Sequence, residues 1–168
     1  MDKTQNAQRN AAAADSGEGL LLRLELRSDP SLLCAVRGAV ERLTEGFGFS
    51  AEESRSITRA VDEALANIIR HAYQGAPDRP IELKIRATRR RPEGRESADG
   101  LEILLSDHGP AIDPNKLCGR ELDDVKPGGL GLHLIKQSMD IVEFQRADGA
   151  NCLRLVKFVR APKQASHS

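Results

Sequence analysis

The stretch that decides the fold is AVDEALANIIRHAY, residues 60–73, because its apolar residues recur at the spacing of an amphipathic helix. Glu63 and Asn67 are four residues apart, so they lie on one stripe of that helix, one turn from each other. The apolar face is centred well away from Glu63 and consists of Ile57, Val61, Ala64, Leu65 and Ile68. The pattern predicts a helix that packs on a sheet and presents Glu63 and Asn67 to a neighbouring cleft.

This pair of side chains has two interpretations. A carboxylate at Glu63 is suited to act as a general base, and the amide oxygen of Asn67 is a hard ligand suited to Mg²⁺. The alternative is an ordinary solvated helix face, which is the usual place for charged residues. The helix begins after Ser50, where Glu53 completes a capping-box pattern, and we expect it to run to about Tyr73.

The flanking sequence predicts the rest of a two-layer domain. Upstream, the alternation in LLLRLELRSDP, residues 20–30, predicts a half-buried strand, and a helix follows from about Pro30 to Gly46. Downstream we expect strands at 81–88 and 101–107, loops at 88–100 and 117–128, a helix at 129–140 and a hairpin at 142–159 that turns near Asp148 and Gly149. This order predicts an α+β fold, with helices on one face of a mixed, mostly antiparallel sheet.

A second motif is LLSDHGPAIDP, residues 104–114. An apolar strand delivers Asp107 at its end, where a carboxylate can accept a hydrogen bond from an exocyclic amine such as that of adenine. Gly109 follows two residues later, and the absence of a side chain allows a flat ring to approach the backbone. The alternative is a plain strand followed by a turn, because Asp and Gly are common turn residues.

The third motif is KPGGLGLHLIKQSMD, residues 126–140, in which Gly128, Gly129 and Gly131 lead into an amphipathic helix. Backbone amides at a helix N-terminus form an anion site, so phosphates are suitable ligands. The segment is neither a Walker A loop nor a dinucleotide fingerprint, since Leu134 stands where the latter needs a third glycine. The alternative is a flexible loop before a helix.

Composition restricts the protein class. The 168 residues suit one domain, which we place at residues 19–161 between disordered tails at 1–18 and 162–168. Lys plus Arg equals Asp plus Glu at 25 each, so charge gives no argument for nucleic acid binding. No membrane span or secretory signal is visible, which predicts a cytoplasmic protein with reduced thiols at Cys34, Cys118 and Cys152.

The three motifs in this order resemble the histidine-kinase-like ATPase superfamily, and the chain is similar to its stand-alone anti-sigma-factor serine/threonine kinases over about residues 20–160. The resemblance rests on DEALANIIRHAY, LSDHGPAIDP and RELDDVKPGGLGLHLIKQSMD. It implies a two-layer α/β sandwich of the Bergerat type that binds ATP and Mg²⁺. One departure is Ala111, where many superfamily members have a second glycine.

The resemblance also implies roles for individual residues. By position, Glu63 would be the catalytic base, Asn67 the Mg²⁺ ligand and Asp107 the residue that recognises the adenine amine. The remaining implied contacts are Gly109 lining the base pocket, Gly129 and Gly131 holding phosphates, and Lys126 or Arg120 reaching the γ-phosphate.

The function implied by the resemblance is that of a kinase that phosphorylates a STAS-domain anti-anti-sigma protein and sequesters a sigma factor, as a homodimer, without contact to nucleic acid or membrane. A second hypothesis is a non-catalytic regulator that binds nucleotide and a sigma factor or other partner without phosphoryl transfer. A plain ATPase is a third, but such chains usually carry a long lid or a transducer domain.

Overall fold

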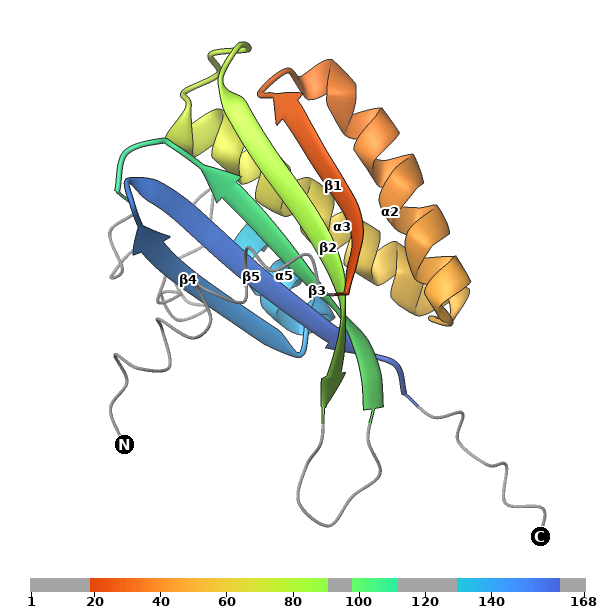
Figure 1. The fold of residues 1–168 in the computed structure, drawn as a ribbon. Helices are drawn as coiled ribbons and strands as arrows, with labels where there is room; N and C mark the ends of the chain where they lie inside the picture. The colour runs from red at the N-terminus through yellow and green to blue at the C-terminus, as the bar shows by residue number, and fades with distance from the viewer. Residues whose placement is uncertain (1–18, 91–97, 112–129, 161–168) are drawn as a thin grey trace, which may run out of the picture.

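In the computed structural model, helices cover one face of a five-stranded sheet (Figure 1). The structure describes residues 19–90, 98–111 and 130–160. The strand order is β1-β2-β3-β5-β4, and each neighbouring pair is antiparallel. The strands are β1 (Leu20–Arg27), β2 (Pro80–Arg90), β3 (Ala98–Asp107), β4 (Ile141–Ala147) and β5 (Ala150–Phe158), and the α-helices are α2 (Leu33–Phe47), α3 (Ala51–Asn67) and α5 (Leu130–Ser138).

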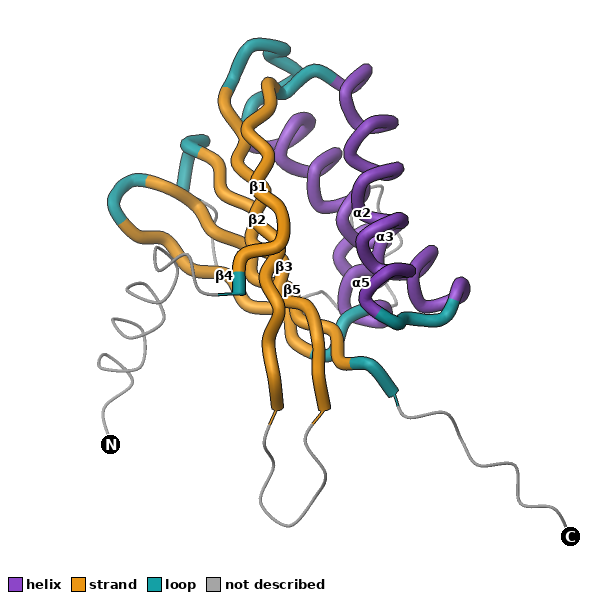
Figure 2. The backbone as a smooth tube through the Cα atoms, turned by 45° about the vertical axis from the view of Figure 1, so that its right-hand side comes forward, coloured by secondary structure: helices purple, strands orange, loops and turns teal. Residues whose placement is uncertain are grey.

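The core lies between the two layers, which Figure 2 shows side by side. Alternate residues of each central strand point toward the helices, so Leu83 and Ile103 are fully buried while their neighbours face the other side of the sheet. From the helical side, α3 contributes Ile57, Val61 and Leu65 to the same core. The predicted α+β fold with a mostly antiparallel sheet is confirmed.

Helix α3 begins as predicted but ends earlier. The Ser50 hydroxyl accepts a hydrogen bond from the Glu53 amide at 3.2 Å, and the Glu53 carboxylate accepts one from the Ser50 amide at 3.0 Å, which completes the capping box. The α-helix stops at Asn67, and the chain continues to Ala72 as a π-helix, η2 (Ile68–Ala72). The Tyr73 amide donates to the Ile68 carbonyl at 3.0 Å, a bond that spans five residues and defines this wider turn.

The hairpins show one confirmed prediction and one error. The β4–β5 turn lies at Asp148 and Gly149, whose φ angles of 52° and 80° suit a tight hairpin turn. The prediction that residues 88–100 form a loop is wrong at both ends, because β2 and β3 pair as far as Arg90 and Ala98. Charged side chains across the pair support this extension, as in the 2.5 Å contact between Arg89 and Asp99.

Several predicted segments lie outside the described residues. These are both terminal tails and the loop at 117–128. The predicted domain limits therefore stay predictions. Within the described residues, no helix combines the length and the apolar character needed to cross a membrane.

Candidate functional site

Glu63 of α3 lies directly against the first turn of α5. A Cβ atom built on Gly131 would lie 2.1 Å from Oε1 of Glu63 and 2.7 Å from its carboxyl carbon. Both distances are far below van der Waals contact, so only glycine fits at this place with the present Glu63 conformation. Glu63 of the helix motif and Gly131 of the glycine motif therefore lie next to each other in space. In the chain they are 131 − 63 = 68 positions apart.

The Glu63 carboxylate is also held by a cation from its own helical segment. Nη2 of Arg70, in η2, lies 3.2 Å from Oε1 of Glu63. The side chain of Glu63 is 31% exposed, so the carboxylate is accessible from one side. Asn67, one turn beyond Glu63, is the last residue of α3 and is half-buried.

Asp107 is the buried end of β3, with only 3% of its surface exposed. Its Oδ1 atom accepts hydrogen bonds from the Gly109 amide at 2.8 Å and from Nδ2 of Asn151 at 2.9 Å. Among the described residues, neither of these contacts uses Oδ2. Oδ1 is therefore held by two protein donors, and Oδ2 is not held by either of them.

Gly109 connects the aspartate motif to the helix motif. A Cβ atom on Gly109 would lie 2.7 Å from Cβ of Ala72 and 3.1 Å from the Ala72 carbonyl oxygen. Ala72 belongs to η2, which continues α3. The turn after β3 therefore packs directly on the end of the helix that carries Glu63 and Asn67.

The Tyr73 hydroxyl connects η2 to strands β2 and β3 through two hydrogen bonds. Its hydroxyl donates to the Pro80 carbonyl at 2.6 Å and accepts the His108 amide at 2.8 Å, so it joins the end of η2 to the start of β2 and the end of β3. Burial raises the pKa of the Tyr73 hydroxyl above its ordinary value of 10.0, and the nearby Asp107 charge acts in the same direction.

Sequence reasoning missed the support of Asp107 from β4 and β5. Asn151 is 4% exposed and its oxygen accepts a 2.5 Å hydrogen bond from Arg146, which also donates to the Gly109 carbonyl at 3.1 Å. A signal was present in the sequence, because Asn151 stands at a core-facing position in line with Leu153 and Leu155. A polar residue in an apolar register requires a polar partner.

The structure does not test the other residues assigned to the phosphates. Arg120, Lys126, Gly128 and Gly129 lie outside the described residues. No cluster of His, Cys, Asp and Glu with the arrangement of a metal site occurs in the described part of the chain.

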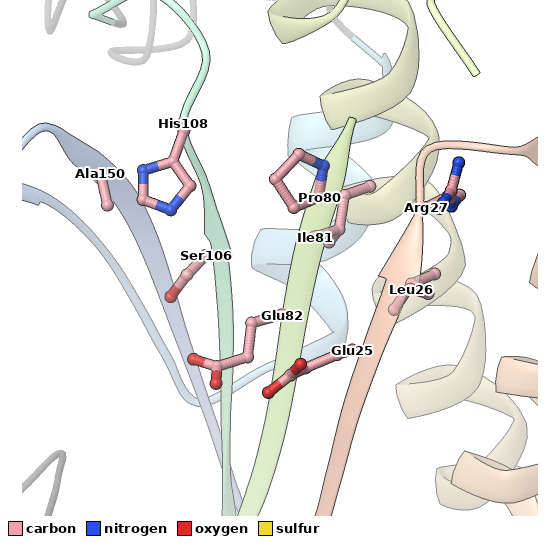
Figure 3. Close-up of a pocket in the computed structure, with 9 residues that line it drawn as sticks. All are labelled: Glu25, Leu26, Arg27, Pro80, Ile81, Glu82, Ser106, His108 and Ala150. Atoms are coloured by element: carbon pink, nitrogen blue, oxygen red, sulfur yellow. The ribbon is translucent and has the colours of Figure 1, made fainter. Parts of the chain in front are cut away.

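A separate pocket of about 540 Å³ lies on the sheet face that the helices do not cover (Figure 3). Glu25, Glu82 and Ser106 line it, and they occupy adjacent strands at positions that alternate with core residues. Glu82 is already paired with Arg23 at 2.7 Å and with Lys84 at 2.9 Å. The pocket is therefore distinct from the region around Glu63, which lies on the helical side of the sheet.

Known proteins resemble this chain in sequence and in fold. Residues 26–157 match the family model of the histidine kinase-like ATPase domain. The serine/threonine-protein kinase BtrW of Bordetella bronchiseptica is 36% identical over 111 residues, which cover 64% of this chain and 72% of that protein. The serine-protein kinase RsbW of Listeria innocua is 28% identical, with 82% of this chain and 87% of that protein covered.

Among solved structures, the SiaB–SiaC complex from Pseudomonas aeruginosa includes a chain that superposes with a TM-score of 0.58. That superposition covers 93% of this chain and 100% of the other, at 13% sequence identity. At this identity the likeness is one of fold.

Proposed function

This chain belongs to the histidine kinase-like ATPase family and, within it, to the anti-sigma-factor serine/threonine kinases, and we propose that it phosphorylates a STAS-domain anti-anti-sigma protein with ATP. It is a nucleotide-binding domain and a protein kinase by this membership. The acceptor protein, the use of ATP with Mg²⁺ and the effect on a sigma factor are the proposed part.

One observation carries the proposal: the three sequence motifs converge on α3 and its extension η2. Gly131 abuts the Glu63 carboxylate, and Gly109 abuts Ala72 two turns further along. The first turn of α5, the Glu63 carboxylate and the turn after the buried Asp107 therefore lie along one helical segment. A nucleotide needs such an arrangement, because its base and its phosphates are at opposite ends of one molecule.

The residues fit an adenine nucleotide and Mg²⁺. Asp107 has one oxygen held by two donors and the other available for an exocyclic amine, and Gly109 has no side chain to block a ring. Asn67 offers an amide oxygen one turn from Glu63, and Mg²⁺ commonly takes few protein ligands together with phosphate oxygens. We assign the phosphates to the backbone amides of Gly129 and Gly131, with Lys126 at the γ-phosphate.

In the proposed reaction, Glu63 orients the acceptor hydroxyl and takes its proton. The acceptor oxygen forms a bond to the γ-phosphorus, the bond from that phosphorus to the β–γ bridging oxygen breaks, and ADP leaves. The metal neutralises charge on the phosphates when it is bound. Positioning and electrostatic stabilisation supply most of the rate enhancement in such transfers.

In the regulatory scheme that follows, the kinase is a cytoplasmic homodimer that holds a sigma factor inactive. The unphosphorylated STAS-domain protein competes for the kinase, and phosphorylation removes that competitor. The chain itself contacts neither nucleic acid nor membrane in this scheme.

The direct test is transfer of label from radiolabelled ATP to purified STAS-domain proteins of the source organism. We expect one or more of them to be labelled, and Glu63→Ala to abolish the label while nucleotide binding persists in calorimetry. Nucleotide binding without any transfer by the wild-type chain would favour the non-catalytic regulator instead. The intact Glu63 favours the kinase, because a simple binder has no use for a base there.

A further inference from the structure

Arg70 makes a contact that no sequence motif accounts for. Its guanidinium reaches back seven positions to Oε1 of Glu63, at 3.2 Å. Seven residues of a helix rise about 10.5 Å, so both side chains must extend toward each other to meet. The pairing is thus a specific conformation of two long side chains and not a consequence of adjacent positions.

A second hydrogen bond fixes the guanidinium itself. Nε of Arg70 donates to the Ala66 carbonyl at 3.2 Å, while Nη2 holds the Glu63 carboxylate. Two donors of one planar group are therefore used at once, which a lysine ammonium on a flexible stem does not reproduce. The position of the arginine depends on the helical segment that carries it, since η2 changes from α to π geometry just after Asn67.

The contacts on Glu63 leave its two oxygens unequal. Arg70 binds Oε1, and the backbone of Gly131 lies against the same oxygen, so Oε1 is enclosed on two sides. In the described part of the chain, Oε2 takes part in no hydrogen bond. A carboxylate held in this way presents one defined oxygen to an acceptor hydroxyl.

We propose that Arg70 is a positioning residue for phosphoryl transfer, which holds Glu63 through Oε1 so that Oε2 receives the proton of the acceptor hydroxyl. This inference rests on the proposed kinase function. In this role Arg70 acts through the Glu63 carboxylate. Its loss therefore lowers kcat and leaves the affinity for nucleotide unchanged.

The kinetic test uses the STAS-domain protein that the wild-type chain labels. We expect Arg70→Ala to lower kcat by about 10²-fold, the cost typical of a catalytic group displaced by about 1 Å, with KM for ATP unchanged. Arg70→Lys should recover only part of the rate. Millimolar guanidinium added to Arg70→Ala should also restore part of it, which would not happen if the side chain were needed only for folding.

The matched control is Arg55→Ala. Arg55 is an exposed arginine of the same helix, eight positions before Glu63, and the described residues offer it no ion pair. Its removal should leave kcat at the wild-type value. A wild-type rate in Arg70→Ala, or a loss expressed only as a higher KM for ATP, would overturn the positioning role.

A measurement independent of turnover separates this inference from the proposed function. In nitrogen NMR of arginine-labelled protein, the Arg70 guanidinium should show hindered rotation in the wild type and free rotation in Glu63→Gln. Hindered rotation in a chain that labels no acceptor would overturn the kinase proposal while the ion pair stands. Equal rotation in both proteins would overturn the ion pair whatever the activity.

Discussion

A methyl group on Gly131 would lie 2.1 Å from Oε1 of Glu63, so the first turn of α5 and the Glu63 carboxylate adjoin with no room for a side chain between them. The obstacle is the far end of a flexible side chain, which can rotate away. A substitution at Gly131 therefore displaces the candidate base while the fold persists.

Gly131→Ala should reduce phosphoryl transfer by about 10²-fold, because the carboxylate is displaced, and leave the melting temperature within a few degrees of wild type. Transfer is measured with labelled ATP, and stability by thermal unfolding. The control is Gly38→Ala in α2, where nothing lies within 4 Å of the added Cβ. That control should stabilise the protein by about 1 kcal/mol with unchanged transfer. Equal transfer in both variants would contradict the prediction.

Gly109→Ala should weaken nucleotide binding and also destabilise the fold. Its Cβ would meet Cβ of Ala72 at 2.7 Å and the Ala72 backbone carbonyl at 3.1 Å, and a backbone atom cannot rotate away. We expect a loss of about 1–3 kcal/mol in the free energy of unfolding, the usual cost of overpacking. Urea denaturation and calorimetry with ADP measure the two effects, and Gly46→Ala, with open space around it, is the control. Unchanged ADP affinity in Gly109→Ala would refute the close approach of the adenine ring to the Gly109 backbone.

Asn151→Ala should loosen Asp107. The substitution removes the 2.9 Å donor to Oδ1 of Asp107 and leaves the Arg146 guanidinium without its 2.5 Å acceptor. Because these groups are buried or partly buried, we expect about 1–3 kcal/mol of lost stability and weaker ADP binding. Urea denaturation and calorimetry report the two losses. ADP affinity equal to wild type would show that Asp107 keeps its orientation without Asn151.

The raised pKa of Tyr73 predicts that the free energy of unfolding decreases at alkaline pH. Its folded pKa is raised above 10.0, so the unfolded chain ionises first as pH increases. The contribution from Tyr73 is therefore fully present below pH 10 and is lost as pH rises through the folded pKa. Tyr73 is the single tyrosine of the chain, so phenolate absorbance follows it directly and should show a midpoint above that of unfolded protein.

Tyr73→Phe is the matching variant. It leaves the Pro80 carbonyl and the His108 amide without their 2.6 Å and 2.8 Å partner, so stability at neutral pH should fall by about 1–3 kcal/mol. The variant should also lose the alkaline decline that ionisation of Tyr73 causes. A phenolate midpoint in the native protein at or below that of the unfolded chain would contradict the assigned burial.

The sequence by itself determined the local elements and the fold class. The spacing of apolar residues in α3, the Ser50–Glu53 capping box and the turn at Asp148–Gly149 each depend on neighbours within a few positions. Such short-range chemistry acts on the chain wherever the segment lies. The same reasoning identified Glu63, Asn67, Asp107 and Gly131 as candidates, because their motifs have recognisable local patterns.

Only the tertiary structure decided which groups meet. The contact of Glu63 with Gly131 and the bond from Asn151 to Asp107 across 44 positions arise from packing between segments that are distant in the chain. Even the Arg70–Glu63 pair depends on a π turn that no propensity in the sequence signalled. These contacts have no local pattern, because their geometry is set by how α3 and α5 pack and how the strands pair.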